Sequence, residues 1–558
     1  MAQATRPFGP QGRRGLSLWG LGLAERRSAP QNRPMIKPIR WIVASALVVA
    51  HLLFVSHSAQ AANADSGDTV VRTDSGSVEG QAQGGILAFK GLRYAAAPIG
   101  ELRWRAPQPV APWQGTQAAR APGAACIQKP ELSIAAGAGD PRPIDEDCLF
   151  LNVWTPRAGP AARLPVMVWI HGGALVMGSG GLPIYDGAVF AQRGAVLVTL
   201  NYRMGALGFF AHPGLAKADP GTPVNFGLLD QIAALQWVQR NIAAFGGDPG
   251  NVTIFGQSAG AESVLALFTS PLAKGLFHKG IAQSPYGIPS HTLAKARATA
   301  AKVATALQLN GANATAAELR GVPAQAFEKL NGEGLSLAPS FVADDSALPA
   351  PILTTFQQGG EARVPLIIGN TSDDGSIAAD FGLDPAAIVK RLGAARIVVK
   401  SLYPTGIADD QLGRETVRDL VFSAFARRIA YLHTARAPTW RYYYGYVPSG
   451  VRGRTPGVAH GSDVALTMGT LDLCQCLGAP ASEQDREASR RVVTLWFNFA
   501  RSGTPVPGDA ASWPRDGQRD SKLLEFGEAD AVRADFMKTR VNTFIGTLKL
   551  LGSFTAAR

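Results

Sequence analysis

The chain has 558 residues, of which 46% are hydrophobic and 17% charged, a composition that can fill a large core and excludes a disordered or fibrous protein. The formal net charge is +12, but residues 1–61 hold eight Lys and Arg and one acidic residue, so residues 62–558 carry only +5. This modest charge, without a cluster of basic and aromatic residues, excludes a nucleic-acid-binding protein.

Residues 1–61 have the order of a secretory signal peptide. A basic stretch and Met35–Arg40 precede the apolar run Trp41–Val55, and Ser58–Ala61 supplies a cleavage site of the A-x-A type. The run is short for a membrane span, and no second stretch is long enough. We therefore expect translation from Met35, cleavage after Ala61 and export to the periplasm or medium, with no membrane span in the mature chain. An uncleaved N-terminal anchor is the alternative.

Four cysteines follow this leader. In an exported protein they can pair, and a bond between Cys126 and Cys148 would close a modest loop of the kind that disulfides stabilise well. A bond between Cys474 and Cys476 would be strained, and their spacing fits neither a redox motif nor a zinc site. We expect these two to be buried thiols.

The first structural elements are short strands with turns, predicted at 69–72, 76–80 and 86–89, which indicate a small antiparallel meander outside the core. A loop and strand follow at Glu146–Trp154. Three apolar runs are then typical of strands buried on both faces. They are Pro165–Ile170, Ala195–Leu200 and Val252–Phe255.

Helical spacing of apolar residues in Leu228–Asn241, between the last two of these runs, predicts a right-handed parallel crossover. The second half of the chain alternates strands with mostly helical insertions. The strands are predicted at Val364–Ile368, Thr439–Tyr446 and Leu523–Phe526, and the helical stretches at Ala294–Leu330, Asp384–His433 and Glu487–Arg501. No linker divides residues 62–558, so we expect a single α/β domain after the leader.

A nucleophile is predicted where the run Val252–Phe255 ends. Gly256-Gln-Ser-Ala-Gly260 joins this strand to an Ala- and Leu-rich helix, with Ser258 at the apex of the turn. A side chain at Gly256 or Gly260 would clash with the neighbouring strand or helix, so glycine is needed at both. We expect an exposed, strained serine.

A serine nucleophile needs a base, and the base needs an acid that orients it. In chain order the serine comes first, then the acid, then the histidine. His460, in a Gly-flanked loop, is the expected base; His433, the other histidine that follows the acid, lies in a helical segment. The loop after Ile368 holds two candidate acids, Asp373 and Asp374, and we prefer Asp374.

Backbone N–H groups are expected to stabilise the oxyanion that develops when the serine attacks a carbonyl carbon. The glycines of His171-Gly-Gly-Ala174, after a strand, let such groups converge, and the N–H of Ala259, directly after the nucleophile, would join them. Gly178–Gly181 lacks the spacing of a dinucleotide fingerprint, and neither H-E-x-x-H nor a Walker sequence occurs, so no metal or other cofactor is expected.

With these elements the chain resembles the type-B carboxylesterase (carboxylesterase/cholinesterase) family across nearly all of its mature part. The shared segments are Tyr94 with Pro98-Ile-Gly100, Glu146–Val153, His171–Ala174, Asn201-Tyr-Arg203, Phe245–Pro249 and Phe255–Gly260. The resemblance implies an α/β-hydrolase fold with a large, mostly parallel sheet, helices on both faces and helical insertions near the active site. It also implies the catalytic triad Ser258, Asp374 and His460, and oxyanion donors Gly173, Ala174 and Ala259.

The resemblance further implies the disulfide Cys126–Cys148 and the buried ion pairs Arg103–Glu146 and Arg203–Asp230. Two positions depart from the family pattern. Asp374 stands where Glu is usual, so its loop must approach His460 more closely, and Gln257 stands where Glu commonly precedes the nucleophile.

The predicted reaction is hydrolysis of a small-molecule carboxylic ester through an acyl-enzyme, without a cofactor. Amides, thioesters or lactones are alternative substrates, since the triad does not specify the leaving group. A non-catalytic binding module of the cholinesterase type is the alternative from another class. Acyl and alcohol specificity cannot be deduced from the sequence.

Overall fold

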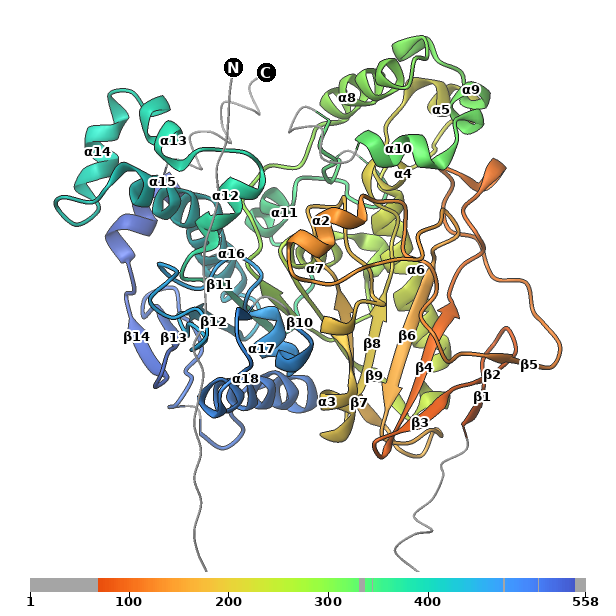
Figure 1. The fold of residues 1–558 in the computed structure, drawn as a ribbon, viewed down its shortest axis with the longest axis horizontal. Helices are drawn as coiled ribbons and strands as arrows, with labels where there is room; N and C mark the ends of the chain where they lie inside the picture. The colour runs from red at the N-terminus through yellow and green to blue at the C-terminus, as the bar shows by residue number, and fades with distance from the viewer. Residues whose placement is uncertain (1–68, 331–336, 344, 475–476, 510, 547–558) are drawn as a thin grey trace, which may run out of the picture. The chain divides into compact units, whose positions relative to one another are not determined.

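An 11-stranded sheet organises the computed structural model, which describes residues 69–330, 337–343, 345–474, 477–509 and 511–546 (Figure 1). The leader, its cleavage site and the start of the predicted domain lie outside these ranges. The strands, in spatial order, are β14 (Ala531–Ala534), β13 (Lys522–Phe526), β12 (Thr439–Tyr444), β11 (Leu366–Thr371), β10 (Lys279–Gln283), β9 (Gly247–Gln257), β7 (Leu164–Ile170), β8 (Val196–Leu200), β6 (Phe150–Thr155), β4 (Ile86–Arg93) and β3 (Gln81–Gln83).

The seven strands from β7 to β13 are parallel, and antiparallel strands flank them at both edges. Helices cover both faces, as expected for a parallel sheet. The described α-helices include α2 (Pro130–Ala135), α3 (Ala188–Gln192), α4 (Gly205–Gly208), α5 (Pro213–Ala218), α6 (Phe226–Asn241), α7 (Ala259–Thr269), α8 (Leu293–Ala306), α9 (Ala316–Gly321), α10 (Ala324–Leu330), α11 (Ile352–Gln358), α12 (Ile377–Asp380), α13 (Pro385–Arg391), α14 (Ala395–Ser401), α15 (Asp409–Val417), α16 (Ala424–His433), α17 (Val464–Met468) and α18 (Glu483–Ser502).

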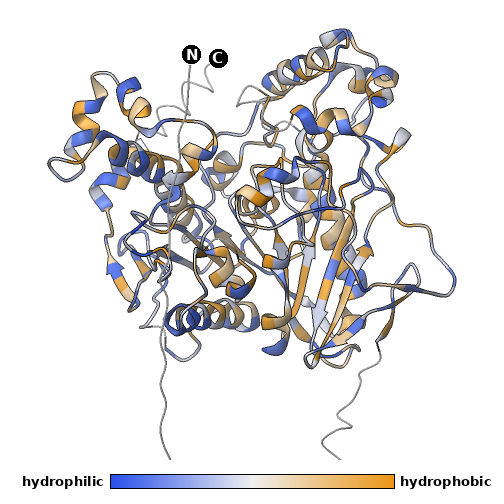
Figure 2. Cartoon of the chain, viewed as in Figure 1, coloured by the Kyte–Doolittle hydropathy of each residue, from blue (hydrophilic) through white to orange (hydrophobic). Residues whose placement is uncertain are grey.

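Strand β7 shows how the sheet divides the core. Successive side chains of a strand point to opposite faces: Val166, Val168 and Ile170 pack with residues of α6 and α7, whereas Met167 and Trp169 pack with residues of α3 and α18. All five are fully buried. Figure 2 shows the hydrophobic strands of the sheet and the largely hydrophilic outer surface of α18. The prediction of strands buried on both faces is confirmed.

The predicted meander is partly wrong. Strands β1 (Val70–Arg72) and β2 (Ser77–Glu79) form a small separate sheet with β5 (Thr116–Ala118), but β4 is an integral part of the main sheet and pairs with β6. The predicted strand ended at Phe89, whereas a register shift between Phe89 and Leu92 lets β4 continue to Arg93.

Four strands, β3, β5, β10 and β14, were absent from the prediction. Strand β10 reads Lys-Gly-Ile-Ala-Gln, too short and too polar to stand out by pattern, although all five residues are buried between β9 and β11. Strand β14 is mostly exposed and antiparallel to β13. Tertiary pairing, rather than local preference, makes β10 and β14 strands.

The predicted covalent and ionic links are present. Cys126 and Cys148 form a disulfide, and the Arg103–Glu146 and Arg203–Asp230 pairs each bring a guanidinium nitrogen and a carboxylate oxygen within 2.5 and 2.7 Å. The thiol expected at Cys474 is wrong, because that residue is disulfide-bonded; Cys476 lies outside the described residues.

No helix among the described residues has the length and apolar character needed to cross a membrane.

Candidate active site

Ser258 lies at a sharp turn between β9 and α7. Its backbone angles are φ 57° and ψ −123°, a left-handed φ that non-glycine residues rarely adopt and that is typical of strained functional positions. A Cβ built on Gly260 would overlap the carbonyl oxygen of Ile170, and one on Gly256 would lie 2.5 Å from the same atom. The two glycines therefore allow the turn to pack against the end of β7, as predicted.

The expectation of an exposed serine is wrong, because only 9% of Ser258 is accessible. The loop after β7 covers it: a Cβ on Gly172 would lie 3.3 Å from Ser258 Cβ and 2.6 Å from the carbonyl oxygen of Gln257. The nucleophile candidate is thus held directly beside the His171–Ala174 segment.

Asp374 and His460 lie on two neighbouring loops, and their side chains are in contact. His460 Nδ1 lies 2.7 Å from Asp374 Oδ1. The second carboxylate oxygen accepts hydrogen bonds from the backbone N–H of Thr371 at 2.8 Å and from the hydroxyl of Ser284 at 3.0 Å. Asp374 is fully buried, so these donors replace water and fix the carboxylate in one orientation.

Asp373, the competing acid, points elsewhere. Both of its carboxylate oxygens bond to the guanidinium of Arg414. Its backbone N–H donates to the carbonyl of Val458 at 3.0 Å, and the N–H of His460 donates to Ser376 Oγ at 2.9 Å. These bonds tie the acid loop to the histidine loop, which brings the short Asp374 side chain within reach of His460.

His460 Nε2 faces Gln257. Because Nδ1 meets a carboxylate, the neutral ring carries its hydrogen there, and Nε2 is left as an acceptor. Nε2 lies 3.2 Å from Gln257 Nε2, which can donate to it. No hydrogen bond joins Ser258 Oγ to His460 in the described part of the chain, so Gln257 occupies the nitrogen that a serine nucleophile would need.

The Gln257→Glu variant is expected to move the acidic limb of the kcat/KM profile to higher pH by about one unit or more, because a carboxylate beside His460 favours the protonated ring. The other acidic groups that act on His460, Asp374, Asp380 and Asp463, are unchanged. Profiles of wild type and variant on one ester measure the shift. Gln484→Glu, on the exposed side of α18, serves as the control, and coincident profiles for all three proteins would contradict the expectation.

The segment His171–Ala174 offers free backbone donors. Among the described residues, no protein acceptor bonds the N–H of Gly173 or Ala174, and Ala259 is the first residue of α7, where helix N–H groups lack intrahelical partners. Ala174 and Leu175 both have left-handed φ values, 53° and 61°. The backbone here is strained, as is common where a loop serves a site.

His171 orients the first of these peptide groups. Burial lowers the pKa of His171 to about 4, so the ring is neutral at pH 7. Its Nδ1 lies 2.8 Å from the carbonyl oxygen of Gly172; a carbonyl only accepts, so Nδ1 carries the hydrogen. In a planar trans peptide the N–H points opposite to the C=O. The N–H of Gly173 is therefore directed away from the His171 ring.

Asp463 is a second buried carboxyl group near His460. Burial above all, and then the charge of Asp374, raise the pKa of Asp463 from 3.8 to about 6. Its Oδ2 accepts from Gln283 Nε2 at 3.0 Å, and its Oδ1 has no hydrogen-bond partner among the described residues. An ionised Asp463 thus carries an unsatisfied buried oxygen.

The Asp463→Asn variant is expected to gain stability over wild type as pH rises. Between pH 4 and 6 unfolded Asp463 releases its proton while folded Asp463 keeps it, so the wild type loses up to about 3 kcal/mol across this window and the variant does not. Denaturant unfolding at pH 4 and pH 8 measures the difference. Asp410→Asn, at an exposed position, is the control. A gap between Asp463→Asn and wild type that stays constant with pH would contradict the account.

Three residues of this site were not predicted from sequence. Ser284 follows β10, a strand that was not predicted. The ring of Phe422, in the π-helix η7 (Arg418–Ser423), lies 5.1 Å from the ring of His460. Asp463 stands three residues after His460, but nothing in its local pattern marks it as buried. Only the tertiary fold brings these side chains to the site.

Comparison with known proteins identifies relatives for nearly the whole described chain. The model of the Carboxylesterase family matches residues 67–403 and 409–544. A fumonisin B1 esterase of Sphingopyxis macrogoltabida is 35% identical over 512 residues, covering 87% of this chain and 91% of that protein. A para-nitrobenzyl esterase of Bacillus subtilis (strain 168) is 36% identical over 482 residues, covering 82% and 94%.

Solved structures agree with this assignment. A carboxylesterase of Geobacillus stearothermophilus superposes with a TM-score of 0.76 at 29% identity, covering 85% of this chain and 100% of that one. A thermophilic para-nitrobenzyl esterase gives 0.75 at 32% identity, covering 86% and 100%. The α/β-hydrolase fold inferred from the sequence is confirmed. The chain belongs to the carboxylesterase family and is a carboxylic ester hydrolase.

Proposed function

We propose that this protein hydrolyses carboxylic esters through an acyl-enzyme, with Ser258 as nucleophile, His460 as general base and Asp374 as the acid that orients it. Gly173, Ala174 and Ala259 would donate their N–H groups to the oxyanion. The observation that carries the proposal is the 2.7 Å contact between His460 Nδ1 and the buried Asp374, beside a serine on a strained turn.

In the first half of the reaction, Ser258 Oγ bonds to the ester carbonyl carbon while its proton passes to His460 Nε2. The carbonyl oxygen becomes an oxyanion, which the three N–H groups stabilise more strongly than the neutral carbonyl. The tetrahedral intermediate then breaks its bond to the alcohol oxygen, which takes the proton from His460. In the second half, water repeats these steps and releases the acid and Ser258.

Asp374 would serve this cycle by position and charge. Its contact with Nδ1 keeps the hydrogen on that nitrogen, so that Nε2 can accept a proton, and it stabilises the imidazolium that forms. Proton transfer also requires Nε2 to exchange Gln257 for Ser258 Oγ. Hydrogen bonds of this kind often tighten only when substrate is bound.

Residues 1–61 are proposed to be a leader that directs export and is removed, leaving 62–558 as a single hydrolase domain. A disulfide at Cys126–Cys148 suits an oxidising compartment. The N-terminal sequence of the exported protein tests this: it should begin at Ala62, and a retained Met1 or Met35 end would contradict cleavage.

Small-molecule carboxylic esters are the proposed substrates, by analogy with the para-nitrobenzyl and fumonisin B1 esterases to which the chain is similar. A panel of chromogenic para-nitrophenyl esters, from acetate to decanoate, tests the proposal with the wild-type protein. We expect saturable release of nitrophenol for at least the short acyl chains. Release no faster than in buffer across the whole panel would contradict it.

A further inference from the structure

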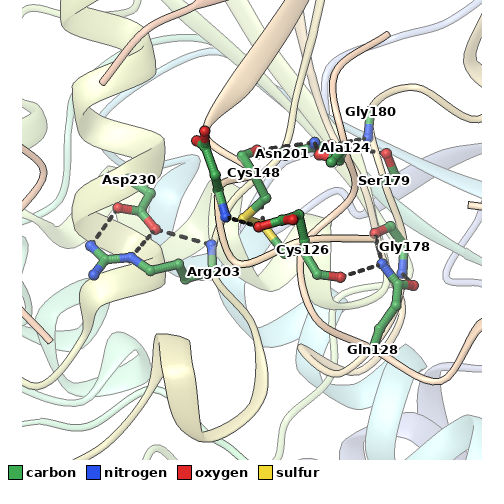
Figure 3. The surroundings of a disulfide bond; sticks show 12 residues. Ala124, Cys126, Gln128, Cys148, Gly178, Ser179, Gly180, Asn201, Arg203 and Asp230 are labelled. Atoms are coloured by element: carbon green, nitrogen blue, oxygen red, sulfur yellow. Dashed lines mark hydrogen bonds and ion pairs between the residues drawn. A yellow bond between two sulfur atoms is a disulfide. The ribbon is translucent and has the colours of Figure 1, made fainter. Parts of the chain in front are cut away.

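Gln128 is a fully buried side chain that uses both ends of its amide on the backbone. Its Nε2 donates to the carbonyl of Gly178 at 2.8 Å and to that of Cys126 at 3.0 Å, and its Oε1 accepts from the N–H of Gly178 at 2.7 Å. Figure 3 shows this reciprocal pair beside the Cys126–Cys148 disulfide. Gly178 is thereby fixed to the loop that carries the disulfide.

Gly178 in turn packs directly on the ring of His171. Its φ is 115°, which disfavours any side chain, and a Cβ there would overlap His171 Nδ1 and lie 2.9 Å from the carbonyl oxygen of Gly172. On another side the ring stacks on Tyr202, with centroids 4.4 Å apart. The position of Gly178 therefore limits where the ring of His171 can lie.

The same ring bonds the carbonyl oxygen of Gly172, and this peptide group carries the N–H of Gly173. A continuous set of contacts thus leads from Gln128 through Gly178 and His171 to a proposed oxyanion donor. We propose that Gln128 is a positioning residue, which holds the loop His171–Gly178 so that the N–H of Gly173 meets the oxyanion. This inference rests on the proposed function of that loop.

The two segments that Gln128 joins are each held by further contacts. Gln128 follows the disulfide by two residues, and Asn201 fixes the next part of the loop, with its Oδ1 accepting from the N–H of Gly180 at 2.8 Å and from Ser179 Oγ at 3.0 Å. Asn201 Nδ2 also donates to the carbonyls of Ala124 and Cys148. With Gly180 held independently by Asn201, removing the Gln128 amide releases Gly178 selectively instead of freeing the entire loop.

The Gln128→Met variant tests this role, because methionine has a similar length and no hydrogen bond to Gly178. Loss of a complete oxyanion donor costs about 10²- to 10³-fold in kcat, so a misplaced donor should cost about 10- to 100-fold, with KM within about twofold. The inhibition constant of a trifluoromethyl ketone, which forms a tetrahedral oxyanion on the serine, should rise by the same factor as kcat falls. Rates are expressed per active site, counted by completed phosphonate labelling, so that partial misfolding does not imitate the effect.

The matched control is Gln239→Met. Gln239 also donates to two backbone carbonyls, those of Pro249 and Leu276, at 3.0 Å each, but it belongs to α6 and forms no hydrogen bond with the loop among the described residues. It should keep wild-type kcat per site and inhibitor affinity. Equal kcat and inhibitor affinity for wild type, Gln128→Met and Gln239→Met would overturn the inference while leaving the proposed function intact. A wild type inactive on every ester would overturn both.

Discussion

The Ser258→Ala variant is expected to lose about 10⁶-fold in kcat on a chromogenic short-chain ester, because removal of the nucleophile of a serine triad has an effect of this size. No other serine hydroxyl lies at the turn between β9 and α7, so none can take over the attack. Release of nitrophenol at saturating ester, corrected for the rate in buffer, measures the loss.

Folding must be separated from chemistry in this experiment. Alanine removes only one hydroxyl from a buried position, so the melting temperature should stay near that of wild type. Ser346→Ala, at an exposed position, should keep full activity. If Ser258→Ala, folded by the same criterion, hydrolysed the ester at the wild-type rate, another residue would have to be the nucleophile.

The Asp374→Asn variant is expected to lose about 10⁴-fold in kcat, with little change in the fold. The N–H of Thr371 donates to Oδ2, so the asparagine oxygen should keep that position and turn its NH₂ group toward His460. An NH₂ donor cannot accept from Nδ1–H, and the ring would shift its hydrogen to Nε2. His460 could then no longer take the proton of Ser258.

Asp373→Asn is the matched comparison, since Asp373 is adjacent in sequence but pairs with Arg414. It should lower stability by about 1 kcal/mol and leave kcat close to wild type. The reverse outcome, a large loss of kcat for Asp373→Asn and a small one for Asp374→Asn, would show that Asp373 is the acid and contradict the role of Asp374.

Much of the fold follows from local patterns. The apolar runs that became β7, β8 and β9 needed two covered faces, and helices had to supply the cover. The Gly-Gln-Ser-Ala-Gly turn likewise predicted two glycines without room for a side chain, and the carbonyl of Ile170 explains why. Strand β10 escaped prediction because its burial comes from its neighbours and not from its own five residues.

The site was harder to predict from the sequence than the fold. Chain order and loop context indicated Ser258, His460 and an acid at Asp373 or Asp374. The preference for Asp374 depended on which carboxylate faces the histidine loop. The burial of Ser258 and the contact of Gln257 with His460 depend on how separate loops meet. No local sequence pattern predicts contacts between separate loops. The hydrogen bonds between Gln128 and Gly178 could not be predicted for the same reason.

Covalent labelling tests the central claim most directly. Wild-type protein treated with an organophosphonate that carries a chromogenic leaving group should release one leaving group per chain, and peptide mass spectrometry should place the phosphonyl group on Ser258. Ser258→Ala should take up none, and Asp374→Asn should react far more slowly. Folded wild-type protein that stays unlabelled, or a label on a different residue, would contradict Ser258 as the nucleophile of this esterase.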